Sequence, residues 1–238
     1  MRNYFLVVQL LLSGIYGLYA AEPGALPLPV FDVHFVVASD NAELAAKVSR
    51  ELFEREIEIL NRDFVTDTGA KIIEFRFKSL ATHAEFGAAD CAARDTLKSV
   101  DVKNAAWKKD LYRLYRECRD PRLRDLKAIN FIVVDNCSEK SGCSDVDSMG
   151  GAAGNRPFVL IDRERLGNNI QSPEVHEMGH AFGLGHSCHP GATTKTATNI
   201  MGSREKCKGS GGLRNLGFTA KQVKTIEARI KLYKKQGL

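Results

Sequence analysis

Three histidines and one glutamate stand close together in this sequence at a spacing that suits metal chemistry. His176, Glu177 and His180 form an H-E-x-x-H run, and His186 follows six residues after His180. Residues four apart on a helix lie on one face, so His176 and His180 can present ring nitrogens to the same ion. Glu177 lies one step round the helix, where its carboxylate can take a proton from a metal-bound water. The run therefore predicts a catalytic metal centre.

A third ligand has to approach such an ion from a different direction, because the same straight helix would present it at the wrong angle for a tetrahedron. Gly183 lies between His180 and His186 and can take the positive φ that turns a chain out of a helix. His186 would then return toward the ion, and the fourth position is left to water, as in catalytic zinc sites. A polar helix whose histidines face solvent is the alternative interpretation.

The full spacing, H-E-x-x-H-x-x-G-x-x-H, resembles the zinc-binding motif of the metzincin metallopeptidases. The run from Asn199 to Gly202 follows at the distance of the metzincin Met-turn, in which a methionine lies beneath the three histidines. The resemblance implies one catalytic Zn²⁺ held by His176, His180 and His186. It also implies that Glu177 is general base and then general acid, and that Met201 is the hydrophobic floor.

The branch of the family is less sharply indicated. Ser187, directly after the third histidine, resembles the matrixins, where His-Ser is usual. The sequence shows neither a latency segment of the Pro-Arg-Cys-Gly type nor a clear set of ligands for the additional zinc and calcium sites of matrixins. Ser203 stands where astacins and serralysins have a tyrosine two places after the methionine. The resemblance therefore indicates a divergent branch.

The amino-terminal residues resemble a secretory signal peptide. Arg2 precedes a short apolar run over residues 4–12, and small residues follow at Ala20 and Ala21. A transmembrane anchor is the alternative, but the run is short and is broken by Ser13 and Gly14.

We therefore expect a signal peptide over residues 1–20, a linker over 21–30 and one metzincin-like catalytic domain over 31–238. No membrane span is expected after signal removal, and the mature protein is expected to be secreted, either extracellular or periplasmic. The sequence makes no prediction of oligomeric state.

All six cysteines follow the leader, which fits an oxidising compartment. Several pairings are possible, and our preferred one is sequential: Cys91 with Cys118, Cys137 with Cys143, and Cys188 with Cys207. The last pair would brace the segment between the third histidine and the Met-turn. A structural zinc site built from Cys188, His189 and Cys207 is the alternative for these residues.

Hydrophobic patterning predicts the elements that must position the site. Strands are expected over residues 30–38, 72–77, 129–134 and 158–161, and helices over 41–57, 102–117 and from Thr219 onward. Helices that alternate with strands predict an α/β (α+β) fold with a twisted, mostly parallel sheet. The resemblance adds an antiparallel edge strand, an active-site helix, a Met-turn and a C-terminal helix.

The substrate-binding residues are expected on either side of the metal. By resemblance, residues 148–154 form the edge strand of the cleft, where Gly150, Gly151 and Ala152 would let a peptide backbone come close. Leu213 and Phe218 would form a wall of the pocket for the residue after the scissile bond. An ordinary glycine-rich loop without a ligand is the alternative for residues 148–154.

These features predict a secreted zinc endopeptidase that acts on a protein or peptide substrate. A binding module or toxin that uses the same scaffold with little or no turnover is the alternative. The formal net charge is +5, and we expect this basic excess to be spread out, since no arginine stripe interleaved with aromatics is found. This pattern predicts a solvated surface and no nucleic-acid partner, and it leaves an acidic substrate or an anionic cell surface open.

Overall fold

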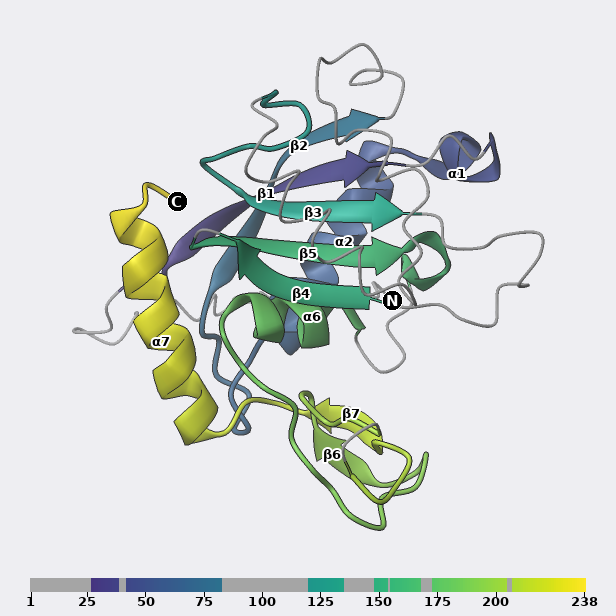
Figure 1. The fold of residues 1–238 in the computed structure, drawn as a ribbon, viewed down its shortest axis with the longest axis vertical. Helices are drawn as coiled ribbons and strands as arrows, with labels where there is room; N and C mark the ends of the chain where they lie inside the picture. Colours follow the sequence, from purple (N-terminus) through teal and green to yellow (C-terminus); the bar gives the residue numbers. More distant parts are fainter. Residues whose placement is uncertain are drawn as a thin grey trace, which may run out of the picture.

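A five-stranded sheet forms the centre of the structure, a computed structural model that describes residues 27–38, 42–82, 120–134, 148–153, 155–167, 173–204 and 207–238 (Figure 1). The strand order is β2-β1-β3-β5-β4. Strands β2, β1, β3 and β5 run parallel, and β4 runs antiparallel to β5 at the edge. The bounds are β1 Val30–Val37, β2 Glu74–Thr82, β3 Ile129–Val134, β4 Ser148–Ala153 and β5 Arg156–Asp162. The predicted fold class is confirmed, including its antiparallel edge strand.

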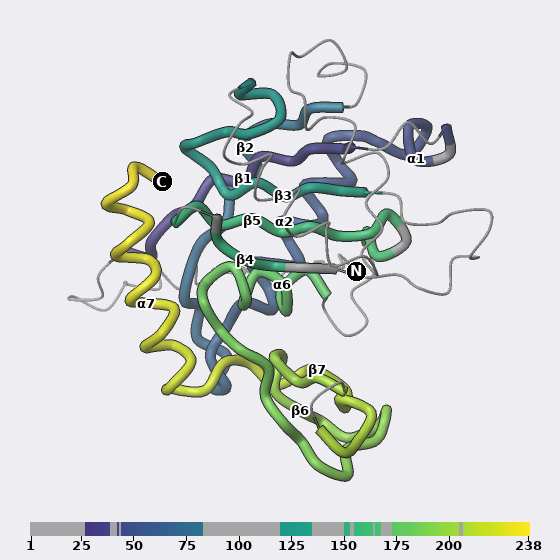
Figure 2. Tube along the Cα trace, viewed as in Figure 1, coloured from purple at the N-terminus to yellow at the C-terminus, as the bar shows by residue number. Residues whose placement is uncertain are grey.

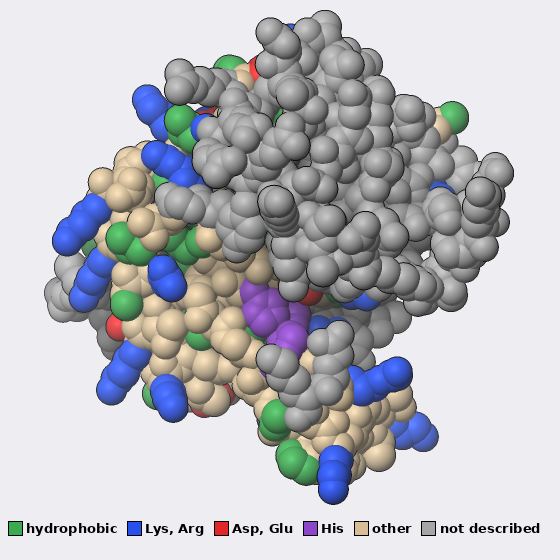
Figure 3. All heavy atoms as spheres, viewed as in Figure 1, with side chains coloured by type: hydrophobic (Ala, Val, Ile, Leu, Met, Phe, Trp, Pro, Cys, Tyr) green, Lys and Arg blue, Asp and Glu red, His purple; other side chains and the backbone are tan. Residues whose placement is uncertain are grey.

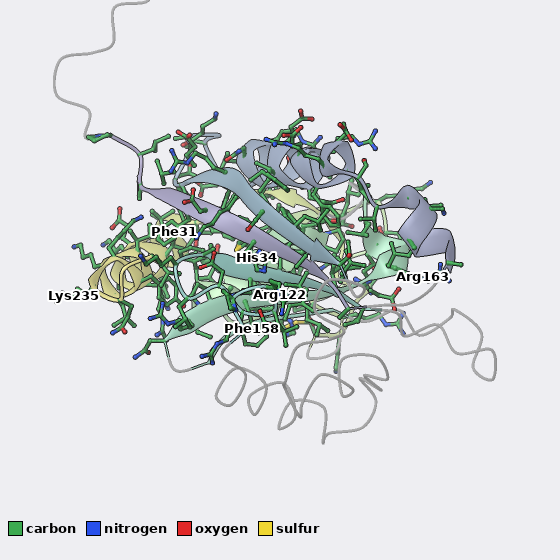
Figure 4. All side chains as sticks on the ribbon, turned by 90° about the horizontal axis from the view of Figure 1, so that it is seen from above. Phe31, His34, Arg122, Phe158, Arg163 and Lys235 are labelled. Atoms are coloured by element: carbon green, nitrogen blue, oxygen red, sulfur yellow. A yellow bond between two sulfur atoms is a disulfide. The ribbon has the colours of Figure 1, made fainter. Side chains whose placement is uncertain are left out.

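The central strands are mostly apolar because both of their faces are covered. Every residue of β3 is buried, and β5 is buried from Pro157 to Asp162. Continuous apolar runs of this kind are typical of parallel strands in the interior of a sheet. Buried polar side chains in these strands have hydrogen-bond partners. The ring of His34 in β1, for example, contacts Ser79 Oγ at 2.9 Å and the carbonyl oxygen of Arg122 at 3.0 Å (Figure 4).

Two helices pack on the sheet and on each other. Helix α2 (Arg50–Asp63) contacts β2, and α6 (Pro173–Ala181) contacts β4 and β5 as well as α2. The core between these helices and the sheet is rich in phenylalanine; Phe35 of β1, for example, has its ring centroid 4.6 Å from that of Phe53 in α2. This core holds α6 firmly against the edge of the sheet.

The amino-terminal helical region differs from the single helix expected over residues 41–57. It is divided into α1 (Ala42–Lys47) and α2, with Ser49 between them. The Ser49 hydroxyl accepts a hydrogen bond from the Leu52 N–H at 3.2 Å and so caps α2. A serine that caps a new helix satisfies backbone donors locally, which favours a break at this position.

Three further elements lie after α6 in the chain. A two-stranded parallel sheet consists of β6 (Ala197–Asn199) and β7 (Leu213–Leu216), and α7 (Ala220–Lys235) follows (Figure 2). The predicted start of α7 is confirmed, because Thr219 and Gln222 form a capping box. A short helical turn, η1 (Arg163–Arg165), follows β5.

Some sequence predictions fall on other parts of the chain. The signal peptide, the helix expected over residues 102–117 and four of the six cysteines lie outside the described residues. The domain boundaries therefore stay predictions. Among the helices that the structure describes, none combines the length and the hydrophobicity that a bilayer crossing requires.

Two glutamates are fully buried where α2 meets α6. Glu56 comes from α2 and Glu174 from the first turn of α6, and the Gly167 N–H donates to a Glu56 carboxyl oxygen. Burial, together with the charge of the neighbouring Glu56 carboxylate, raises the pKa of Glu174 to about 9. Burial also raises the pKa of Glu56 to about 7. The two carboxyl groups therefore share a proton near neutral pH.

This pair should make the protein less stable in alkali. Because both pKa values are raised above the ordinary value of 4.5, their stabilising protonation is complete below about pH 4.5 and is lost as the pH rises toward about 9. Glu56→Gln should lessen this loss by on the order of 3 kcal/mol, since an amide can donate to Glu174 without titrating. Denaturant unfolding at pH 5, 7 and 9 measures the effect. Glu58→Gln, at an exposed position of the same helix, is the control; equal pH slopes for the two variants would contradict the assignment.

Candidate metal centre

The helix α6 carries the H-E-x-x-H run and ends as the sequence predicts. It begins at Pro173, a residue favoured in the first turn because it needs no hydrogen-bond partner for its nitrogen. After Ala181 the chain turns at Gly183, which has a φ of +84°. The Leu184 N–H then bonds the Gly179 carbonyl at 3.0 Å. This turn redirects the chain toward His186.

The three histidines converge on one point. Each offers a ring nitrogen, and these three atoms lie within 4.8 Å of one another. The Nε2 atoms of His176 and His180 are 3.2 Å apart. A tetrahedral ion with Zn–N bonds of about 2.0–2.1 Å would place two ligand nitrogens about 3.4 Å apart, so this spacing fits zinc. Figure 3 shows the histidine side chains as one patch on the surface.

Hydrogen bonds orient two of the rings for metal binding. His176 Nδ1 lies 2.7 Å from the Ile200 carbonyl, and His180 Nδ1 lies 2.7 Å from the Leu184 carbonyl. A carbonyl only accepts, so both Nδ1 atoms carry the proton and both Nε2 atoms keep a lone pair for a metal. Burial, with a contribution from the charge of Arg214, lowers the pKa of His176 to about 2. The ring is therefore held in its neutral, metal-binding form.

Met201 lies directly beneath α6. Its side chain is fully buried, and a Cβ atom placed on Gly179 would lie 2.4 Å from the Met201 sulfur. Gly179 stands between the two histidines of the helix, so the thioether packs under the site where a larger helix residue would displace it. The Met201 carbonyl also accepts from the Ser187 N–H at 2.7 Å. This backbone bond joins the Met-turn to the residue that follows His186.

A polar network behind the metal centre was not predicted from the sequence. Asn199 accepts from the Met201 N–H at 3.0 Å and donates to the Gly217 carbonyl at 2.7 Å. Its amide also bonds the side chain of Gln222, which in turn reaches the Ser187 hydroxyl at 3.2 Å. The network ties the start of α7 to both sides of the Met-turn. The sequence indicated Gln222 as a helix-capping residue. It gave no indication of the role of Asn199 apart from its position close to Met201.

The disulfide between Cys188 and Cys207 forms as predicted. It closes the segment that begins just after His186 and contains the Met-turn. The alternative structural zinc site with His189 is not formed, because both sulfur atoms belong to the disulfide. The other two predicted pairs involve Cys91, Cys118, Cys137 and Cys143, which lie outside the described residues.

Removal of this disulfide should loosen the third histidine. Replacing Cys188 and Cys207 together by serine opens a loop with a sequence separation of 19, and a loop of this size corresponds to about 3 kcal/mol of stability. We expect a lower denaturation midpoint and weaker metal retention, because the segment that carries His186 gains freedom. Unfolding titrations with and without added zinc test this. A double variant as stable as the parent would show that the hydrogen bonds of Ser187 hold the segment by themselves.

Glu177 and Arg214 form an electrostatic pair beside the histidines. Glu177 is buried, with 6% of its surface exposed, and Arg214 is half-buried in β7. Burial lowers the pKa of Arg214, and the carboxylate of Glu177 opposes that shift. Strand β7 reaches this position because Arg214 pairs with Thr198 of β6, close to the Met-turn. Sequence reasoning missed Arg214, since a single arginine in an irregular glycine-rich segment carries no pattern.

The predicted substrate-binding residues lie in different surroundings. A Cβ atom on Gly150 would lie 1.6 Å from the Glu177 carbonyl oxygen, so this glycine allows β4 to touch α6. Gly151 and Ala152 are half-buried, and Gly151 faces the ring of Phe158. Leu213 is half-buried in β7, whereas Phe218 is fully buried with its ring 4.6 Å from that of Phe64. Phe218 thus packs in the core, and Leu213 keeps an accessible surface.

Two solved bacterial structures align with this chain at low sequence identity. Metalloproteinase-II from Bacteroides fragilis aligns with 12% identity and a TM-score of 0.45, over 85% of this chain and 53% of that chain. Mature mirolysin of Tannerella forsythia, solved in complex with a cleaved peptide, aligns with 12% identity and a TM-score of 0.42, over 90% and 97%. The chain thus spans about half of the Bacteroides protein.

No protein-family model matches the sequence, and no curated protein matches it significantly. The metzincin-like features are therefore properties of this chain itself. They are the mixed sheet with an antiparallel edge strand, the helix with two histidines, the glycine turn and the third histidine. Together they define an α/β protein with a histidine triad that fits the H-E-x-x-H-x-x-G-x-x-H zinc motif.

Proposed function

We propose that this chain is a secreted zinc-dependent endopeptidase that resembles the metzincins. The observation that carries the proposal is the convergence of three histidine nitrogens beside the buried carboxylate of Glu177. His176, His180 and His186 would hold the ion. When bound, Zn²⁺ would lower the pKa of a coordinated water and polarise the peptide carbonyl.

Glu177 is the proton carrier in this proposal. Its carboxylate lies one residue from His176 on α6, where it is buried and interacts electrostatically with the charge of Arg214. Glu177 takes the proton from the attacking water and then delivers it to the departing amine. Met201 supports the site from below, since its side chain is buried against Gly179.

Strand β4 supplies a place for an extended peptide. It stands at the end of the described sheet and pairs with β5 on one side. An extended substrate that adds to the other side would bond backbone to backbone and lie next to α6, because Gly150 touches the Glu177 backbone. A site open along an edge strand suits the middle of a chain, so an endopeptidase is favoured. Leu213 of β7 would contact a substrate side chain.

Secretion is part of the same proposal. The apolar run near the amino terminus resembles a signal peptide, and the Cys188–Cys207 disulfide fits an oxidising compartment outside the cytoplasm.

Cleavage of an unbiased peptide library tests the proposal directly. The zinc-loaded mature protein is incubated with the library beside a chelator-treated sample and the Glu177→Ala variant, and cut sites are identified by mass spectrometry. Internal cuts that vanish in both controls would support an endopeptidase. One bound zinc without any cuts would instead favour a binding module or toxin on the same scaffold.

His186→Ala tests the ligand set independently of turnover. His186 is the only one of the three histidines that follows the helix, and its loss leaves two ligands on α6. We expect zinc affinity to fall by more than about 100-fold, which exceeds the usual effect of removing an outer hydrogen-bond partner. His189→Ala removes a nearby histidine that is not part of the triad and is the control. Equal zinc affinity in the two variants would mean that a different residue is the third ligand.

A further inference from the structure

The net positive charge of this chain is matched by the charge of one helix. Six basic residues and one acidic residue give α7 a formal charge of +5, which equals the net charge of the whole chain. The expectation that the basic excess is spread along the chain is therefore wrong. The formal charges of the remaining residues therefore sum to zero, and α7 carries a charge equal to the whole net excess.

Four lysines of α7 form an exposed stripe. Lys221, Lys224, Lys231 and Lys235 follow one another at separations of three, seven and four residues, which return to nearly the same side of a helix. All four are exposed, whereas Ile226, Ile230 and Tyr233 bury the opposite side. At 1.5 Å per residue the stripe is about 21 Å long. Figure 3 shows basic side chains along the edge formed by α7, on the same face as the histidines.

The other two cations of α7 contribute to packing. Lys234 donates to the Val30 carbonyl at 2.5 Å and lies 4.2 Å from the centre of the Phe31 ring. The Arg229 side chain lies over Gly183, where an added Cβ would meet its Nε at 2.7 Å. The ion pairs found among the described residues include none of the four lysines of the stripe. Within the part of the chain that the structure describes, the charges of the stripe therefore face solvent and not an acidic partner.

We propose that the lysine stripe, defined as Lys221, Lys224, Lys231 and Lys235, binds a linear acidic polysaccharide. A straight row of ammonium groups matches a polysaccharide that carries sulfate or carboxylate groups at intervals. When the lysines neutralise these groups, the counterions of the polysaccharide are released, which favours binding. The ammonium group of lysine is a point charge, whereas the planar guanidinium group of arginine makes paired hydrogen bonds to one anion. Binding by lysines is therefore governed by charge density and not by a particular anion geometry.

The stripe fits a polysaccharide better than a membrane. The large hydrophobic side chains that are exposed among the described residues are Leu28, Leu126 and Leu216, and none of them belongs to α7. An interfacial helix inserts apolar or aromatic residues into the lipid, and here the apolar side of α7 is buried in the protein. The stripe also lacks aromatic residues for stacking on nucleic-acid bases. A bound polysaccharide would hold the protein at an acidic matrix with the histidine site beside it.

Retention on immobilised heparin, a sulfated polysaccharide, tests the stripe. The zinc-loaded protein is eluted with a salt gradient beside a variant in which all four lysines of the stripe are changed to glutamine. The control changes four exposed lysines elsewhere to glutamine, namely Lys47, Lys71, Lys127 and Lys195. Both variants lose the same net charge, so only the position of the charge differs. Neither set of residues belongs to the metal centre, and no step depends on peptide cleavage.

We expect the stripe variant to elute at much lower salt than the control variant. By analogy with nucleic acids, the slope of log K against log salt should fall by about 3 when four contacts are lost. Equal elution of the two variants, or failure of the parent to bind at physiological salt, would overturn the proposal. Binding to vesicles that contain phosphatidylserine but not to heparin would also overturn it and assign the stripe to membranes.

Discussion

Replacement of Glu177 by alanine is expected to leave zinc bound and to lower peptide cleavage by about 10³-fold or more, the scale of losing a proton-transfer group. The two histidines of α6 are oriented without this side chain, because His176 and His180 are held by the carbonyls of Ile200 and Leu184. Zinc content by elemental analysis and kcat/KM on a peptide identified from the library measure the two effects.

Two further variants separate proton transfer from structure. Glu177→Gln keeps the size of the side chain and cannot accept a proton, so it should be as inactive as alanine. Glu177→Asp keeps a carboxylate at a shorter reach and should retain part of the activity. If the glutamine variant cleaves at the rate of the parent, Glu177 is not the general base.

Gly150→Ala is expected to destabilise the protein strongly. The new Cβ would lie 1.6 Å from the Glu177 carbonyl oxygen and 2.5 Å from its carbonyl carbon, and both are backbone atoms that cannot rotate away. Strand β4 and helix α6 must therefore separate, at a cost of about 3 kcal/mol or more. Denaturant unfolding measures the loss of stability, and zinc affinity should fall as well because α6 carries two ligands.

The neighbouring glycine provides a matched control. A Cβ on Gly151 would approach the Phe158 ring at 3.3 Å, and a small shift of that side chain accommodates it. Gly151→Ala should therefore cost less than about 1 kcal/mol. Similar stabilities for the two variants would show that β4 does not touch α6 at Gly150.

The elements that were predicted correctly are those whose signal is local. Strands β1, β3 and β5 appear as apolar runs because they are buried on both faces. The start of helix α7 is indicated by the capping residues Thr219 and Gln222. The division between α1 and α2 was missed, since Leu44 and Leu52 fit one continuous helical pattern and the cap at Ser49 competes with it.

Short elements after the metal ligands had no local signal. Strands β6 and β7 contain only three and four residues, and they exist because distant backbone groups pair, as when the Ile200 N–H bonds the Leu216 carbonyl at 2.7 Å. The same contacts bring Arg214 next to Glu177. Pairing between segments this far apart depends on tertiary contacts. A short stretch of sequence therefore does not predict it.

The sequence by itself determined the candidate metal ligands, the glycine turn and the capped final helix, because each depends on residues a few positions apart whose geometry is set by the helix repeat. It also indicated the Cys188–Cys207 pair, although it could not exclude other pairings. Only the tertiary structure decided which ring nitrogens carry protons, through the carbonyls of Ile200 and Leu184. It likewise decided the burial of Glu56 against Glu174 and the contact of Gly150 with α6. These features arise where separate elements pack together, so their energies depend on distances that sequence spacing does not specify.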